Sequence, residues 1–165
     1  MLLLIQYTLI FASVLMLVAL GGCFSEHSGV INLGLEGIMV IGALGGALVM
    51  RYAASVPPAA MILMVLLGAA AAGAIYSVLL AVACINFSAD QTIVGTALNM
   101  LGTAAATVLV KAINTAANPD DVSSTIQYVE QKKAFVVNIG SFEFNWFMVL
   151  ALIALIAGAF LDGIG

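Results

Sequence analysis

Long apolar runs separated by short polar stretches dominate the pattern of this chain. The runs cover approximately residues 2–22, 29–50, 58–85, 89–113 and 146–161. Unbroken hydrophobicity in a buried core helix rarely exceeds about 14 residues, whereas a helix that crosses a bilayer needs about 20. The pattern therefore predicts about five membrane-embedded helices.

A closed β-barrel is the other structure that spans a bilayer, because lipid offers the backbone no hydrogen-bond partner. Barrel strands appear as alternating segments of about 10 residues. The runs here are longer, do not alternate, and are rich in Ala, Leu, Met and Gly. The predicted fold class is an all-α integral membrane protein.

Composition supports a multi-pass membrane protein. The chain has 165 residues, is 64% hydrophobic, and carries only 4 basic and 8 acidic side chains. So few charges cannot coat the surface of a soluble domain of this length. The acidic residues are scattered, so the net charge of −4 says little about partners. We expect the lipid bilayer and no nucleic acid among them.

Glu36 stands out because it lies inside an apolar run. Asn32 precedes it by four residues and projects from the same helix face. An ionisable group in a span faces a bundle interior or a water-filled path, and nearby Gly29, Gly34 and Gly37 permit a broken helix. Two interpretations stay open: a lining of a translocation path or its gate, and a carboxylate that bonds a neighbouring helix and holds a kink.

The fourth run carries a polar stripe with helical spacing, comprising Thr92, Thr96, Asn99, Thr103 and Thr107. The stripe serves either as interhelical packing, which we favour, or as one wall of a polar path. Small residues at Gly42, Gly46, Gly95 and Gly102 indicate close helix packing.

The start of the fourth run has the spacing of a capping box. Ser88 and Gln91 are three residues apart, which predicts that Ser88 caps the helix.

The sequence offers no set of residues for catalysis or metal binding. Cys23 and Cys84 fit neither a metal-ligand spacing nor a disulfide framework, and small buried side chains are the simpler interpretation. His27 is the single histidine, and no nucleotide-binding or hydrolase motif is present. We expect no catalytic residue, no metal and no cofactor.

Two segments resemble a known family. GGCFSEHSGVINLGLEG (Gly21–Gly37) and, downstream, ADQTIVGTALNMLG (Ala89–Gly102) are similar to motifs of bacterial permeases that import nucleosides or simple sugars. These permeases belong to the branched-chain amino acid and sugar type of ABC importer. The resemblance implies the type II importer permease fold, with one helix broken by Gly, Asn and Glu.

The resemblance also implies partners and site residues. This chain would pair with a second permease subunit, a cytoplasmic ATP-binding subunit that hydrolyses ATP, and an extracytoplasmic solute-binding protein, in the bacterial cell (inner) membrane. The implied path or gate residues are Asn32, Glu36, Gln91 and Asn99. The implied helix-break and packing residues are Gly29, Gly34, Gly37, Gly42, Gly46, Gly95 and Gly102.

We expect one transmembrane permease domain over residues 1–165, with an extramembrane loop at residues 114–145. In such permeases a basic cytoplasmic loop and further spans follow, so this chain is expected to be an N-terminal part. The family orientation would place Arg51, Lys111, Lys132 and Lys133 on the outer side.

Two other functions remain as alternatives. A small proton-coupled carrier would use Glu36 to take up and release a proton. A non-transporting membrane scaffold would need the threonine and glycine positions only for packing.

Overall fold

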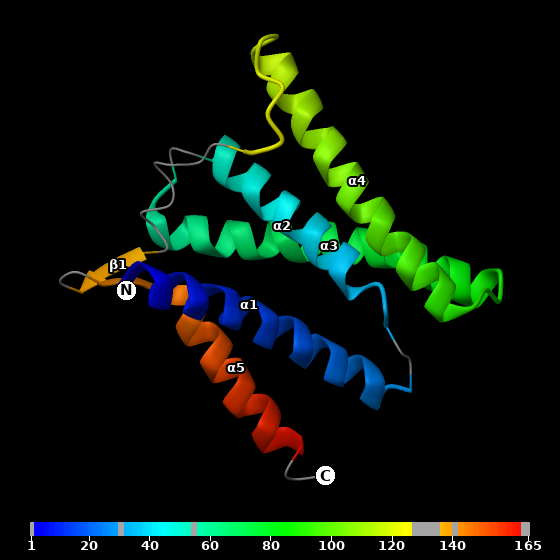
Figure 1. The fold of residues 1–165 in the computed structure, drawn as a ribbon. Coiled ribbons are helices and arrows are strands. Elements are labelled where there is room, and N and C mark those ends of the chain that lie inside the picture. Colours follow the sequence, from blue (N-terminus) through cyan, green and yellow to red (C-terminus); the bar gives the residue numbers. More distant parts are fainter. Residues whose placement is uncertain (1, 30–31, 54–55, 127–135, 140–141, 163–165) are drawn as a thin grey trace. The chain divides into compact units, whose positions relative to one another are not determined.

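The computed structural model describes residues 2–29, 32–53, 56–126, 136–139 and 142–162. These residues form five helices and two short strands, shown in Figure 1. The elements are α1 (Leu2–His27), α2 (Leu35–Tyr52), α3 (Pro58–Asn86), α4 (Gln91–Ala117), β1 (Val136–Ile139), β2 (Phe142–Asn145) and α5 (Trp146–Asp162). The chain divides into two compact units, residues 1–30 with 132–165, and residues 31–131.

The predicted helical membrane fold is confirmed. Four helices among the described residues are long and apolar enough to cross a membrane, namely residues 7–27 of α1 and the whole of α2, α3 and α4. The fifth, α5, is an apolar helix of 17 residues. The predicted count of about five is therefore close.

Two predicted boundaries around the first polar stretch are wrong. Helix α1 continues to His27, through residues expected to form a connection, because nothing between Cys23 and His27 prevents helical geometry. The helix ends where Gly29 adopts a φ of +80°, a left-handed conformation that glycine accepts at little cost. Helix α2 then begins only at Leu35, so the expected break lies before Glu36.

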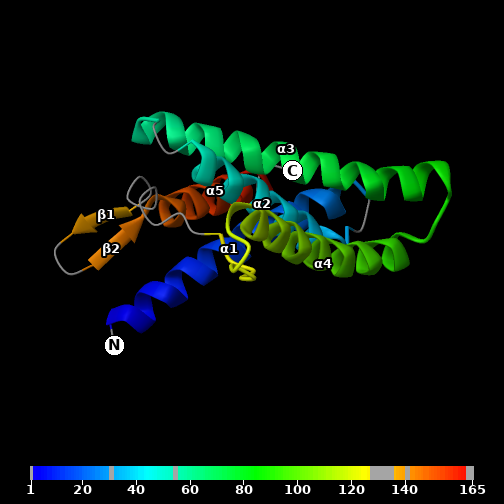
Figure 2. The same cartoon turned by 90° about the horizontal axis from the view of Figure 1, so that it is seen from above.

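The first unit contains α1, α5 and the hairpin between them in the sequence. Ser13 of α1 and Ala151 of α5 are buried, with 6% and 1% of their surfaces exposed. A Cβ atom added to Gly158 would lie 2.7 Å from Cδ2 of Leu20, so glycine permits close packing of α5 on α1. Figure 2 shows β1 and β2, which pair antiparallel.

The second unit is a bundle of α2, α3 and α4. Residues 42 and 46 of α2 face residues 69 and 65 of α3, so these two helices run antiparallel. Residues 37 and 51 of α2 contact residues 99 and 114 of α4, so those two run parallel. Small residues at the crossings let the backbones approach closely, as is common in membrane helix packing.

The apolar core of this bundle is small. Tyr76, Leu80 and Leu98 are buried together where the three helices meet. Large apolar side chains point outward instead, and Ile75 and Met100 have 74% and 78% of their surfaces exposed. An outward apolar surface suits lipid, where no hydrophobic effect drives such side chains inward.

Candidate functional site

The start of α2 is shaped by Asn32. Its side-chain Oδ1 accepts a hydrogen bond from the backbone N–H of Gly34 at 3.0 Å, which turns the chain into the helix. Asparagine favours such turns because its amide imitates a backbone carbonyl. Gly34 is the N-cap residue and has no side chain that can cap the helix. The first turn of α2 therefore needs another partner.

Asn99 of α4 supplies that partner. Its Oδ1 accepts a hydrogen bond from the backbone N–H of Gly37 at 2.8 Å, and its Nδ2 donates to the carbonyl of Leu33 at 2.8 Å. The N–H groups of a first helical turn have no partner within their own helix. The amide of Asn99 thus fixes the entry into α2 from a different helix.

Glycines bring the two backbones close enough for this contact. A Cβ atom at Gly37 would lie 2.6 Å from the carbonyl oxygen of Leu98, and one at Gly102 would lie 2.9 Å from Cα of Gly37. A Cβ atom at Gly95 would lie 3.0 Å from the nitrogen of Gly34. The opposing atoms belong to the backbone, so they cannot turn aside as a flexible side chain can.

Two further glycines lie where α2 packs on α3. A Cβ atom at Gly42 would lie 3.2 Å from the carbonyl oxygen of Ala69, and one at Gly46 would lie 3.3 Å from Cγ1 of Val65. Gly29 differs, because a Cβ atom there would contact nothing within 4 Å. Its positive φ, rather than packing, accounts for glycine at that position.

Tyr76 joins the third helix to this junction. Its hydroxyl donates a hydrogen bond to the carbonyl of Leu98 at 2.6 Å, and only 8% of the residue is exposed. Sequence reasoning missed Tyr76. The available signal was a polar hydroxyl inside an otherwise apolar run, because a buried tyrosine hydroxyl usually finds a hydrogen-bond partner.

Glu36 lies in the first turn of α2 and is exposed. Among the described residues its carboxylate forms no hydrogen bond or ion pair, so the bond between helices comes from Asn99. A negative charge at a helix N-terminus is favoured by the helix dipole. The side chain of Glu36 is therefore free to face solvent, solute or another subunit.

Gln91 is the first residue of α4 and is also exposed. Its own side chain makes no hydrogen bond within the described part of the chain. The helix is capped by Asp90, whose Oδ1 accepts from the N–H groups of Thr92 at 2.8 Å and Ile93 at 3.2 Å. The bonds from Ile93 and Thr92 lower the pKa of Asp90 below its usual value.

The predicted cap at Ser88 is wrong. Ser88 has a φ of +49°, whereas Asp90 is the N-cap residue and has the extended geometry usual for a cap. Aspartate caps a helix as effectively as serine does. It also adds a negative charge that the helix dipole favours.

Three threonine hydroxyls of the polar stripe form bonds within α4 itself. Thr96 donates to the carbonyls of Thr92 and Ile93, Thr103 to that of Asn99, and Thr107 to that of Thr103. Within the described residues, Asn99 is thus the member of this stripe whose side chain bonds another helix.

A second polar junction ties α2 to α4 at their other ends. Asn114, only 4% exposed, accepts a hydrogen bond from Nη1 of Arg51 at 2.7 Å. Its Nδ2 lies within bonding distance of the carbonyl of Ser123, at 3.1 Å, and that of Thr125, at 2.9 Å. Sequence reasoning took Asn114 as the first residue of a loop, whereas α4 continues to Ala117.

The site therefore combines residues held by hydrogen bonds and close packing with side chains that are exposed. Asn32, Gly34, Gly37 and Asn99 are brought together and hold the entry to α2, while Glu36 and Gln91 remain exposed. The described residues contain no cluster of His, Cys, Asp or Glu suited to a metal.

Comparison with known proteins finds a family match over nearly the whole chain. The model described as branched-chain amino acid transport system / permease component matches residues 4–161. No solved structure matches significantly.

Three curated relatives match part of the chain. The guanosine ABC transporter permease protein NupQ of Bacillus subtilis (strain 168) is 47% identical over 115 residues, which are 70% of this chain and 36% of NupQ. The nucleoside ABC transporter permease protein NupC of Lactococcus lactis subsp. cremoris (strain MG1363) is 38% identical over 58% of this chain and 30% of NupC. The putative glucose ABC transporter permease protein TsgC13 of Haloferax volcanii is 38% identical over 56% of this chain and 26% of TsgC13. The aligned part is thus between about a quarter and about a third of each relative's length.

Proposed function

The chain belongs to the permease component family of branched-chain amino acid transport systems, and we propose that it forms part of the translocation path of an ATP-driven importer. The solute is a nucleoside or a simple sugar, and a nucleoside is favoured because two of the three relatives are named as nucleoside or guanosine permeases. The chain is a multi-pass protein of the bacterial cell (inner) membrane, in keeping with the four helices of its described residues that are long and apolar enough to cross a membrane.

One observation in the structure carries the proposal for the site. The entry to α2 is held by two hydrogen bonds from Asn99, yet the charged residue in that turn, Glu36, is exposed. A charge on a membrane protein normally faces a path or a bundle interior rather than lipid. Glu36 on this turn is thus suited to line or gate a solute path. Asn32 and Asn99 hold the same turn by hydrogen bonds, and Gln91 belongs to the second family motif; we assign all three to the path as well.

The family supports the partners that we propose. The chain works with a cytoplasmic ATP-binding subunit and an extracytoplasmic solute-binding protein, and it pairs with a second permease subunit at the path. ATP hydrolysis occurs on the ATP-binding subunit, so this chain is not itself the enzyme. We propose one permease domain over residues 1–165, whose extramembrane loop begins after Ala117, where α4 ends, and extends to residue 145.

We propose that the C-terminal ends of α2 and α4 face the outer side, as the family orientation implies. Arg51 lies in the last turn of α2, and Lys111 lies in the C-terminal part of α4. Because these helices run parallel, both basic residues lie toward the same end of the bundle. Lys132 and Lys133 lie outside the described residues.

Uptake of labelled guanosine by cells that express the chain with its partner subunits tests the proposal. Glu36→Ala is expected to abolish uptake while membrane insertion stays intact. Asp120→Ala is the matched control, since Asp120 is an exposed carboxylate in the turn after α4 and outside both family motifs, and it should leave uptake unchanged. Unchanged uptake with Glu36→Ala contradicts a path or gate role for this carboxylate.

The two other functions are not favoured. A proton-coupled carrier would need uptake that collapses with the proton gradient and ignores ATP depletion. A scaffold would move no solute at all. The family match and the named relatives support ATP-driven import instead.

A further inference from the structure

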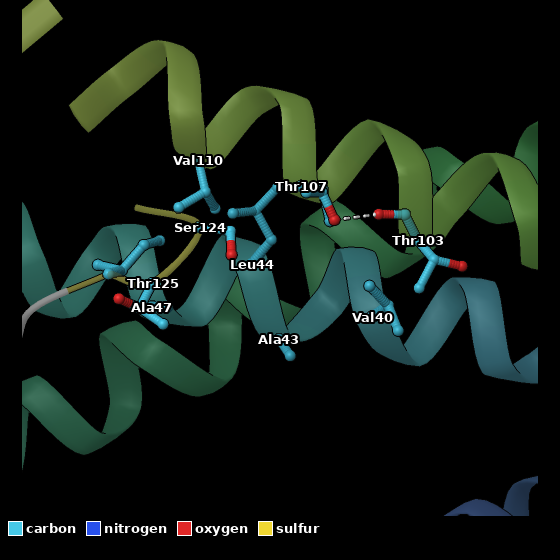
Figure 3. Close-up of a pocket in the computed structure, with 11 residues that line it drawn as sticks. Val40, Ala43, Leu44, Ala47, Thr103, Thr107, Val110, Ser124 and Thr125 are labelled. Atoms are coloured by element: carbon cyan, nitrogen blue, oxygen red, sulfur yellow. Dashed lines mark hydrogen bonds between the residues drawn. The ribbon is translucent and has the colours of Figure 1, made fainter. Parts of the chain in front are cut away.

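A groove of about 390 Å³ lies between α2 and α4, shown in Figure 3. Three of its lining residues, Ser124, Thr125 and Ile126, come from the segment that follows α4. Small-molecule sites in proteins have volumes of about 300–1,000 Å³. The groove is therefore large enough for a solute of nucleoside size.

None of the side chains that line the groove is charged. Its wall is formed by aliphatic residues such as Val40, Leu44 and Val110, together with hydroxyl side chains. A charged solute would lose its hydration there without gaining an opposite charge, which is costly. The lining thus favours a neutral solute over a zwitterion such as an amino acid.

The α4 wall offers hydrogen-bond acceptors. The hydroxyl of Thr103 donates to the carbonyl of Asn99 at 2.5 Å, and that of Thr107 donates to the carbonyl of Thr103 at 2.8 Å, the bond dashed in Figure 3. Each hydroxyl uses its only proton inside the helix and keeps lone pairs that can accept a hydrogen bond. A matching solute must bring donors, such as several hydroxyl groups.

The opposite wall is fixed by Asn114. We name Ser123–Ile126 the strap, and Nδ2 of Asn114 lies within bonding distance of the carbonyls of Ser123 and Thr125 in it. Asn114 lies one turn beyond Val110, which lines the groove. The hydroxyls of Ser124 and Thr125 form no hydrogen bond within the described residues, so they can donate to a solute as well as accept from it.

We propose that this groove is a binding site for the hydroxyl-bearing ring of a neutral solute, such as the ribose of a nucleoside, with the strap as its outer wall. The inference rests on the proposed function and names the place of solute contact. Thr103 and Thr107 accept hydrogen bonds from the ring hydroxyls, while the strap hydroxyls complete the set of polar contacts.

Protection of engineered cysteines by guanosine tests this site. In the full transporter with Cys23 and Cys84 replaced by serine, single cysteines are placed at Ala106 and Ser124, which line the groove. Guanosine is expected to slow their reaction with a maleimide. Val122→Cys is the control, since Val122 is 69% exposed and outside the groove lining, and its reaction should not change.

A second pair of variants tests the acceptor role. Thr107→Val removes a groove acceptor and should raise the guanosine concentration needed for protection about 2–10-fold. Thr96→Val removes a hydroxyl of the same helix that does not line the groove and should leave that concentration unchanged.

The outcomes separate the two proposals. Guanosine uptake without protection at Ala106→Cys, or equal effects of Thr107→Val and Thr96→Val, overturns the groove assignment and leaves the proposed function standing. Absence of guanosine uptake by the unaltered transporter overturns the proposed function, and with it this inference.

Discussion

The side-chain oxygen of Asn99 lies 2.8 Å from the backbone nitrogen of Gly37, so a residue of α4 caps the first turn of α2. A local cap from serine or aspartate at position 34 would act within α2 alone. Here Gly34 supplies none, and the helix start depends on its neighbour. The start of α2 therefore forms only when α2 packs on α4.

Asn99→Ala should lower the stability of the protein by about 1–2 kcal/mol, because it leaves the N–H of Gly37 and the carbonyl of Leu33 without their partner. Thermal unfolding in detergent measures the loss. Asn86→Ala, at the exposed last residue of α3, is the matched control and should cost much less. Equal losses in the two variants contradict a capping role for Asn99.

Gly37→Ala should destabilise the bundle by about 1–3 kcal/mol, since overpacking forces backbone shifts. The added methyl group would meet the carbonyl oxygen of Leu98 at 2.6 Å. Gly21→Ala is the control, because a Cβ atom there meets nothing within 4 Å. In a helix interior that change should be neutral or stabilising by about 0.5–1 kcal/mol. If both variants unfold at the same temperature, the close approach is not as the structure has it.

Tyr76→Phe should lower stability by about 0.5–1.5 kcal/mol through loss of the hydrogen bond to the carbonyl of Leu98. The ring remains, so its packing with Leu80 is kept. Tyr7→Phe removes a hydroxyl from an exposed residue of α1 and should change nothing measurable. Chemical denaturation of the two variants side by side measures the difference, and a silent Tyr76→Phe argues against the bond.

Much of the fold was accessible from the sequence because lipid imposes long, visible apolar runs. Helix α3 begins at Pro58 as predicted, where proline suits a first turn. The end of α1 was misplaced because residues 25–27 are polar yet compatible with a helix, and polarity alone does not end one. Backbone geometry at Gly29 decides the end, and that is a property of conformation rather than hydropathy.

The site was only partly predictable, for a different physical reason. Asn32 and Glu36 share a helical spacing, but Asn32 lies before α2 and turns the chain, so the two do not act as one face. The pattern of apolar and polar residues also does not indicate which helices pack against each other. The bonds of Asn99 to Gly37 and of Arg51 to Asn114 join residues 62 and 63 positions apart.

Asp90 gives a prediction that depends on pH. The N–H groups of Ile93 and Thr92 lower the pKa of its carboxyl group below the usual 3.8. Because the pKa of Asp90 is lower in the folded state than in the unfolded state, its charged form stabilises the folded protein. This stabilisation is complete at pH values above the pKa of the unfolded state and is lost as the pH falls through the pKa of the folded state. The stabilisation that the charged carboxylate of Asp90 gives to the folded protein should therefore be partly lost below about pH 4.

Asp90→Asn isolates this effect, since asparagine caps a helix about as well but does not titrate. Melting temperatures of both proteins, measured from about pH 6 to about pH 3, should converge at the acid end, because only the wild type loses its charged cap. All other carboxylates are common to the two proteins and cancel in the difference. A gap that stays constant over this range would mean that the charge on Asp90 does not support the start of α4.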